Sequence, residues 1–192
     1  MTNFMKFISE IENTLINEMP KIFTSELNPR YIDKNILIPL DKATKEKTIF
    51  DTGIKVGDKH LAVVATSKFN NIYAVGDENG FIGATSVDIF NADKKSYYKI
   101  KITKKFRDRM ENFLIDTYIG ISKDLNNYIF TDDTQSVASS KMWKKMVSNP
   151  KKYNIDVKIL KSFKEIEMDL EDIWGYEDNY MNVLVGIKYK GN

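Results

Sequence analysis

The sequence predicts an α+β protein whose C-terminal half has α/β character. Between residues 61 and 103, short apolar runs alternate with turn signals, as in antiparallel strands. Between residues 105 and 147, apolar residues recur twice at helical spacing, on either side of a short apolar run. Two later apolar runs, at residues 155–160 and 181–189, add strands. We therefore expect a mixed, largely antiparallel sheet flanked by helices.

The first 46 residues are expected to form a helix and an extension ahead of a single domain, residues 47–192. Apolar residues recur at helical spacing through residues 3–19, and Pro20 follows them, which predicts an added N-terminal amphipathic helix. Because the polar face of this helix is acidic, no membrane contact is expected. The helix is expected to pack on the domain or on a neighbouring subunit.

Residues 24–46 have a mixed pattern. Pro29 and Pro39 are interpreted as breakers, and the lysine-rich residues 42–47 predict an exposed turn.

Residues 61–90 predict the first three strands of a meander. Residues 61–66 are β-branched and apolar enough for a buried strand, and residues 71–75 predict a second, shorter strand. The turn Asp77–Gly80 contains the Asn-Gly pair that hairpins favour. Residues 81–90 are expected to form the third strand, interrupted at Gly83.

The fourth strand is expected at residues 97–103. Its alternation places Tyr98, Ile100 and Ile102 on one face of the sheet. The other face then carries Tyr97, Lys99, Lys101 and Thr103.

The pattern after Thr103 changes to α/β. Helices are predicted at residues 105–118 and 134–147, and the second carries Trp143 on its apolar face. A short strand at residues 128–131 separates them, and strands at residues 155–160 and 181–189 follow.

Composition removes several classes of chemistry. The chain has no cysteine, which excludes disulfides, thiolate nucleophiles and cysteine metal sites. Its single histidine, His60, cannot build a multi-histidine metal site and is interpreted as a strand-edge residue. No apolar run reaches the roughly 20 residues that cross a bilayer, so no transmembrane helix is expected.

Charge is segregated along the chain although the net charge is only +2. Residues 94–109 hold eight basic residues against Asp108, whereas residues 165–178 hold seven acids and no base. Two surface patches of opposite sign are therefore expected. They either face each other, or simply solvate the surface, or one of them meets a charged partner.

Two motifs resemble a known family. The first is Thr131-Asp132-Asp133-Thr134-Gln135-Ser136, with Ala138, Met142-Trp143 and Met146 on the following helix. The second is Asp172-Ile173-Trp174-Gly175, followed by Asn182-Val183-Leu184-Val185. With the element order over residues 59–189, they make the chain resemble the GNAT acyltransferase superfamily, in particular the GNAT-like proteins of tailed bacteriophages.

The resemblance implies a splayed sheet whose central strand, residues 97–103, binds the pantetheine arm of an acyl-CoA. The loop after that strand would hold the pyrophosphate, which makes Lys104, Lys105, Arg107 and Arg109 the candidate phosphate ligands. However, Asp108 and Met110 occupy the two positions where the family has glycine. We therefore expect that no cofactor binds. If the chain is an enzyme, the resemblance implies acetyl-CoA or another acyl-CoA as its cofactor.

The resemblance also bears on catalysis. Many members of the family use a tyrosine on the helix after the short strand as the general acid, and the resemblance places Trp143 at the matching position. Asp132 and Asp133 are weak candidates for a general base, or they cap the helix.

Three functions follow. The first is a non-catalytic bacteriophage protein on a GNAT-like scaffold that acts through protein contacts. Its partners would include virion subunits, and it would be located in the virion or in the host cytoplasm. The second is an N-acyltransferase with a non-standard phosphate site. The third is single-stranded nucleic-acid binding through residues 94–109, where Tyr97, Tyr98 and Phe106 lie among lysines.

Overall fold

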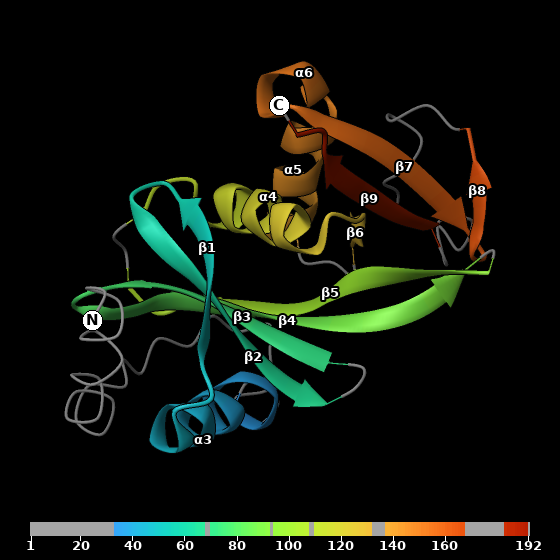
Figure 1. Ribbon diagram of the computed structural model, residues 1–192. Helices are drawn as coiled ribbons and strands as arrows, with labels where there is room; N and C mark the ends of the chain where they lie inside the picture. The colour runs from blue at the N-terminus through green and yellow to red at the C-terminus, as the bar shows by residue number, and fades with distance from the viewer. Residues whose placement is uncertain are drawn as a thin grey trace.

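The computed structural model describes residues 33–67, 70–92, 94–107, 110–131, 137–167 and 183–191. Within these residues, nine strands form one sheet in the order β1-β2-β3-β4-β5-β6-β9-β7-β8 (Figure 1). Neighbouring strands are antiparallel except β5 and β6, which are parallel. The predicted α+β class, with a mixed and largely antiparallel sheet, is confirmed.

The elements follow one another along the chain as a meander and then an α/β part. The helical elements are a π-helical turn η2 (Asp33–Leu37), α3 (Ile38–Glu46), α4 (Phe113–Leu125), α5 (Val137–Val147) and α6 (Pro150–Tyr153). The strands are β1 (Phe50–Val56), β2 (Lys59–Ser67), β3 (Asn70–Asp77), β4 (Gly80–Ala92), β5 (Lys95–Lys105), β6 (Ile129–Phe130), β7 (Ile155–Lys161), β8 (Lys164–Ile166) and β9 (Val183–Tyr189).

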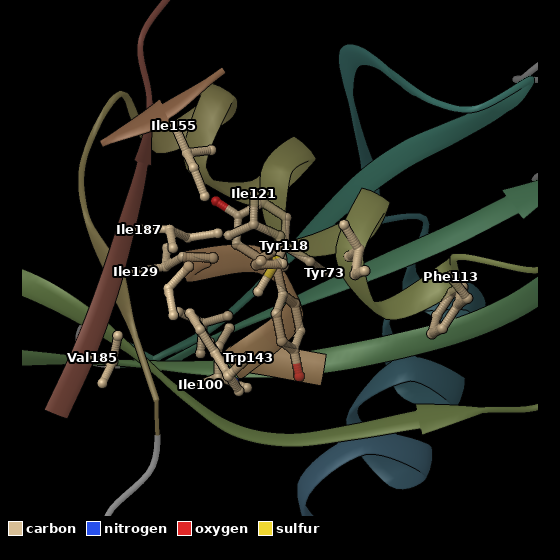
Figure 2. Packing of buried hydrophobic residues seen from close by; sticks show 14 of the residues in the cluster. Tyr73, Ile100, Phe113, Tyr118, Ile121, Ile129, Trp143, Ile155, Val185 and Ile187 are labelled. Carbon is tan, nitrogen blue, oxygen red and sulfur yellow. The ribbon is translucent and has the colours of Figure 1, made fainter. Parts of the chain in front are cut away.

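The larger core lies between the sheet and the pair α4 and α5 (Figure 2). Phe113, Tyr118 and Ile121 of α4 are buried, as is Trp143 of α5. They pack on apolar side chains of the strands, including Leu61, Tyr73, Val87, Ile100, Ile129, Val185 and Ile187. Packing against α4 and α5 therefore joins the meander to the C-terminal strands.

A second core lies on the opposite face of the meander, between its strands and the helical segment formed by η2 and α3 (Figure 1). Ile36, Leu40 and Ala43 are buried against apolar residues of β2 to β5. The predictions of a breaker at Pro39 and of an exposed turn at residues 42–47 are therefore wrong, because residues 38–46 form α3. Pro29 lies outside the described residues. Pro39 occupies the first turn of α3, where its missing N–H costs no hydrogen bond, and Lys47 ends the helix with a left-handed backbone.

The first strand, β1, was not predicted. It pairs with β2 at the sheet edge, and the pairing shifts register between Asp51 and Lys55. Gly53 lies in this irregular stretch with a φ of +75°. The shift disrupts the period-two alternation that would have identified the strand from sequence.

Gly83 does not interrupt its strand, because β4 runs unbroken from Gly80 to Ala92. A Cβ atom at this position would lie 2.3 Å from Cζ of Phe113 and 2.6 Å from the carbonyl oxygen of Lys104. The glycine is thus explained by the close approach of α4 and β5 to β4.

The helix predicted at residues 105–118 begins instead at Phe113 and extends to Leu125. The chain before it continues β5, because Lys105 still pairs with Gly83, and the N–H groups of Phe106 and Arg107 donate to the carbonyl oxygen of Ile82. Tertiary pairing thus overrides the helical spacing of the apolar residues there.

Ile100 and Ile102 do not share a face of the sheet, contrary to the alternation expected for residues 97–103. Val87 pairs with Ile100 and Ser86 pairs with Ile102, so Lys101 is an extra residue that forms a β-bulge. Ile100 therefore lies in the core beneath α4, and Ile102 lies in the core above α3.

Several other predictions are confirmed. The strands at residues 61–66, 71–75 and 155–160 lie within β2, β3 and β7, and the Asn-Gly turn separates β3 from β4. Residues 3–19, 132–136, 168–182 and Arg109 lie outside the described residues, so the N-terminal helix and the Asp172–Gly175 motif stay predictions.

Candidate functional site

The cations expected to hold a pyrophosphate begin inside the sheet, not in a loop. Lys104 and Lys105 are the last residues of β5 and pair with Ala84 and Gly83. The Lys105 ammonium donates to the main-chain carbonyl of Met110 at 2.9 Å. Lys105 therefore stabilises the connection between β5 and α4. Asp108 and Arg109, which complete the predicted loop, lie outside the described residues.

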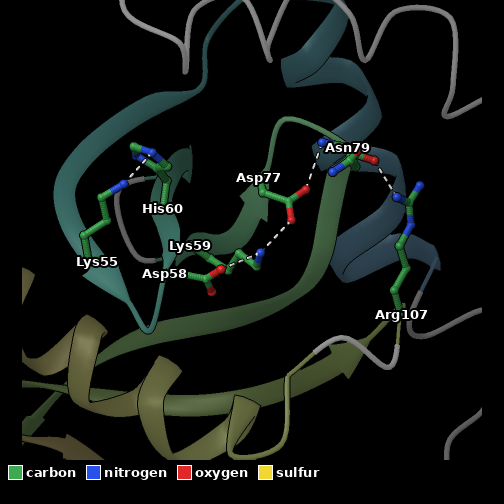
Figure 3. A network of polar contacts seen from close by, with 7 residues as sticks. All are labelled: Lys55, Asp58, Lys59, His60, Asp77, Asn79 and Arg107. Carbon is green, nitrogen blue, oxygen red and sulfur yellow. Dashed lines mark hydrogen bonds and ion pairs between the residues drawn. The ribbon is translucent and has the colours of Figure 1, made fainter.

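Arg107 is bound to the turn between β3 and β4 (Figure 3). Its Nη1 donates to the carbonyl oxygen of Asn79, and its guanidinium lies over Gly80. Gly80 has a φ of +112°, a conformation that side chains rarely adopt. The arginine expected to bind phosphate is thus engaged in holding a hairpin turn.

The same turn is connected to the neighbouring hairpin through Asp77 (Figure 3). One carboxylate oxygen accepts from the N–H of Asn79 at 2.8 Å, and the other pairs with Lys59 at 2.9 Å. Lys59 also pairs with Asp58 at 3.0 Å. These hydrogen bonds to Asp77 and Asp58 raise the pKa of Lys59, so it stays cationic. No sequence motif identifies this network, because its members come from separate turns.

His60 lies beside this network, near the start of β2, where a strand-edge residue was expected. Lys55 donates to its Nε2 at 2.6 Å (Figure 3). Its Nδ1 faces the Asp51 carboxylate at 3.3 Å. Among the described residues, no cluster of three or more histidine, aspartate or glutamate side chains is arranged to hold a metal ion.

A chain of buried hydroxyl groups crosses the central strand. Tyr118 of α4 bonds to Thr103 of β5 at 2.9 Å, and Thr103 bonds to Thr85 of β4 at 3.1 Å. Burial raises the pKa of Tyr118 to about 12, so its hydroxyl is protonated at neutral pH. Trp143 packs against the same tyrosine, with ring centroids 5.4 Å apart (Figure 2). Trp143 is buried, as the sequence predicted for the apolar face of its helix.

The parallel strands β5 and β6 pair over only two positions, Tyr98 with Ile129 and Lys99 with Phe130. Beyond them β5 continues to Lys105, and Thr131 continues the pairing of β6 with β9. The N–H of Thr131 donates to the carbonyl of Val185 at 2.9 Å, and its hydroxyl accepts from the N–H of Val185 at 3.1 Å. Asp132 and Asp133, which follow Thr131, lie outside the described residues.

The aromatic residues expected to bind nucleic acid within residues 94–109 lie in the cores. Tyr97 is buried, Tyr98 packs on the core beneath α4, and Phe106 packs on the core above α3. A different aromatic residue, Phe163 in the β7–β8 turn, is exposed over half of its surface. A turn sequence that carries an aromatic residue between two lysines, Lys161 and Lys164, is the sequence signal that would have identified it.

None of the helices in the described ranges is long and apolar enough to cross a membrane. No protein-family model and no curated protein matches the sequence.

Proposed function

We propose that this chain is a non-catalytic bacteriophage protein on a GNAT-like scaffold, which acts through protein contacts in the virion or in the host cytoplasm. The scaffold is supported by the order of elements: the meander β2–β5, then α4, β6, α5, β7 and β9. The phage origin is supported by the two motifs of the resemblance, around Thr131 and around Trp174. A shared scaffold leaves the activity to be argued from individual residues.

The observation that carries the non-catalytic proposal is the engagement of Lys105 and Arg107 by main-chain carbonyls. Lys105 binds the carbonyl of Met110, and Arg107 binds the carbonyl of Asn79. To bind a pyrophosphate, each cation would first have to leave a contact that stabilises the fold. The side chains at the expected phosphate site are therefore better explained as structural groups.

The surroundings of Trp143 support the same proposal. Its ring packs against Tyr118, whose hydroxyl is bound to Thr103 on the central strand. A tyrosine whose pKa burial raises to about 12 is a poor proton donor for a leaving thiolate.

A protein contact is supported by the edge of the sheet at β1. Of the described residues, Ile38 and Phe50 are the most exposed large hydrophobic side chains, at 62% and 60% of their surfaces. Ile38 begins α3, and Phe50 begins β1 four residues after that helix ends. Apolar side chains beside a strand edge are typical of a surface that pairs with another chain.

The alternative, an acyl-CoA-dependent N-acyltransferase, is favoured by one observation. β5 pairs with β6 only at Tyr98 and Lys99, so the rest of β5 has no β6 partner among the described residues. An open central strand is what the pantetheine arm would require.

Isothermal titration calorimetry with acetyl-CoA distinguishes the two proposals. We expect no saturable heat at millimolar acetyl-CoA for the wild-type protein or for Arg107→Ala. Lys151→Ala, an exposed lysine on α6, is the control for a change in charge. Micromolar binding that Arg107→Ala weakens and Lys151→Ala preserves would establish the enzyme and overturn the non-catalytic proposal.

A further inference from the structure

Two hairpin turns from different parts of the chain meet at one end of the sheet. The β4–β5 hairpin closes with the pair Ala92 and Lys95, and the β7–β8 hairpin closes with the pair Lys161 and Lys164. The ring of Phe163 in the second turn lies 6.0 Å from the ring of Phe90 in the first hairpin. Figure 1 shows β8 beside the end of β4 and β5.

Phe163 has a backbone conformation that its side chain disfavours. Ser162 and Phe163 have φ angles of 48° and 65°, the positive values that type I′ turns require and that asparagine and glycine adopt most easily. A bulky residue with a positive φ is a genuine outlier. Strain of this kind, at an exposed aromatic residue, points to a use for the side chain.

The exposed ring of Phe163 packs against Phe90, which belongs to a cluster of aromatic rings. Phe90 contacts Tyr97 and Phe130 at centroid distances of 5.9 and 5.6 Å, and Tyr128 contacts Phe130 at 6.1 Å. The ammonium of Lys158 lies 4.9 Å from the ring of Tyr128 and pairs with Glu165 at 2.7 Å. This support holds Phe163 in place while half of its surface faces solvent.

Exposed lysines lie in both turns. Lys94 and Lys95 come from one turn, Lys161 and Lys164 come from the other, and all four are exposed. The two turn sequences, residues 91–95 and 161–164, contain a single acid, Asp93. None of the four lysines forms an ion pair with a residue that the structure describes.

We propose that these paired hairpin turns bind single-stranded nucleic acid, with one base stacked on Phe163 and the flanking phosphates held by the lysines. Lysine is depleted in protein–protein interfaces, whereas a cationic track with an exposed aromatic ring is typical of single-strand binding. The site goes beyond the protein contact proposed above and uses the other end of the sheet. In this site Phe163, which the tertiary structure exposes, has the stacking role that the sequence suggested for Tyr97, Tyr98 and Phe106.

The test is fluorescence anisotropy with labelled strands of about 16 nucleotides, as DNA, as RNA and as duplex, in a salt series from about 50 to 200 mM. We expect the single strands to bind more tightly than the duplex. Phe163→Ala should weaken single-strand binding by about 5- to 150-fold, the range of one stacked base. Phe50→Ala, the matched exposed aromatic residue on β1, should leave binding unchanged.

The lysines are tested through the salt dependence. Lys161→Ala with Lys164→Ala should lower the slope of log affinity against log salt by about 1.4, because each lost single-strand phosphate contact removes about 0.7. Lys145→Ala with Lys151→Ala removes the same charge from α5 and α6 and should leave the slope unchanged.

A turn variant separates binding from folding. Ser162→Asn with Phe163→Gly installs the residues that a type I′ turn prefers, so thermal stability should be retained while binding falls to the level of Phe163→Ala. The proposal is overturned if no strand binds at the lowest salt, if Phe163→Ala matches Phe50→Ala, or if the duplex binds equally well. It is also overturned if polyglutamate binds as tightly as the strands, since that outcome identifies an acidic protein partner.

Discussion

Ile100 and Ile102, two residues apart in β5, lie in separate cores on opposite faces of the sheet. A regular strand would place both on one face, and the bulge at Lys101 separates them. The bulge also directs Thr103 toward the α4 face, where it bonds to Tyr118. The polar chain across β5 and the two apolar cores therefore depend on one extra residue.

Independence of the two cores is the first prediction. Ile100→Val and Ile102→Val should each lower the free energy of unfolding by about 0.5–1.5 kcal/mol. Because the two side chains share no packing partners, the double variant should be additive within about 0.5 kcal/mol. Urea unfolding of the four proteins measures the coupling, and a larger coupling energy would mean that the two residues share a core.

The second prediction concerns Gly186 and Phe130. A Cβ atom at Gly186 would lie 2.5 Å from Cε1 of Phe130, and the three nearest atoms all belong to that ring. Gly186→Ala should therefore destabilise the protein by about 1–3 kcal/mol. In a Phe130→Leu background the added methyl group should cost much less. An equal cost in both backgrounds, measured by thermal unfolding, would place the strain elsewhere.

The third prediction concerns alkaline pH. Burial raises the pKa of Tyr118 from 10.0 to about 12, so the folded state favours the neutral phenol. Its contribution is complete below the unfolded pKa and is lost as the pH rises from 10.0 to about 12. The loss amounts to about 2–3 kcal/mol, at about 1.4 kcal/mol for each pKa unit.

Tyr118→Phe tests this contribution, because the variant removes the titrating group and keeps the ring. The wild-type advantage over Tyr118→Phe, measured by urea unfolding, should shrink or reverse as the pH rises above 10.0. A difference that stays constant with pH would contradict the assignment. Burial and a hydrogen bond to Asp124 also raise the pKa of Tyr73. Because Tyr73 is present in both proteins, its contribution cancels in the stability difference.

The fourth prediction concerns the backbone at Phe163. Because its φ is 65°, Phe163→Gly should be more stable than Phe163→Ala by about 1 kcal/mol. At Phe50, in β1, the order should reverse, and alanine should be more stable than glycine by about 0.5–1 kcal/mol. Thermal unfolding of the four variants gives both differences, and the same order at both positions would show that backbone strain at Phe163 is not the cause.

The sequence by itself determined the local elements whose signals are short-range. The apolar β-branched run at residues 61–66 and the Asn-Gly turn specify their backbone conformation through neighbouring residues alone, and β2 and the β3–β4 turn are found there. The apolar face of α5 likewise identified Trp143 as a buried residue. The α+β class followed from these local signals.

Only the tertiary structure decided where long-range pairing competes with local preference. Pairing of Gly83 with Lys105 extends β5 and delays α4 to Phe113, and the bulge at Lys101 reverses the face of Ile102. The candidate site changed for the same reason. Arg107 is bound by a carbonyl 28 residues away, and Phe163 lies against Phe90 from another hairpin. A periodic pattern records which residues are apolar, but the partners that they meet are set only when distant strands come together.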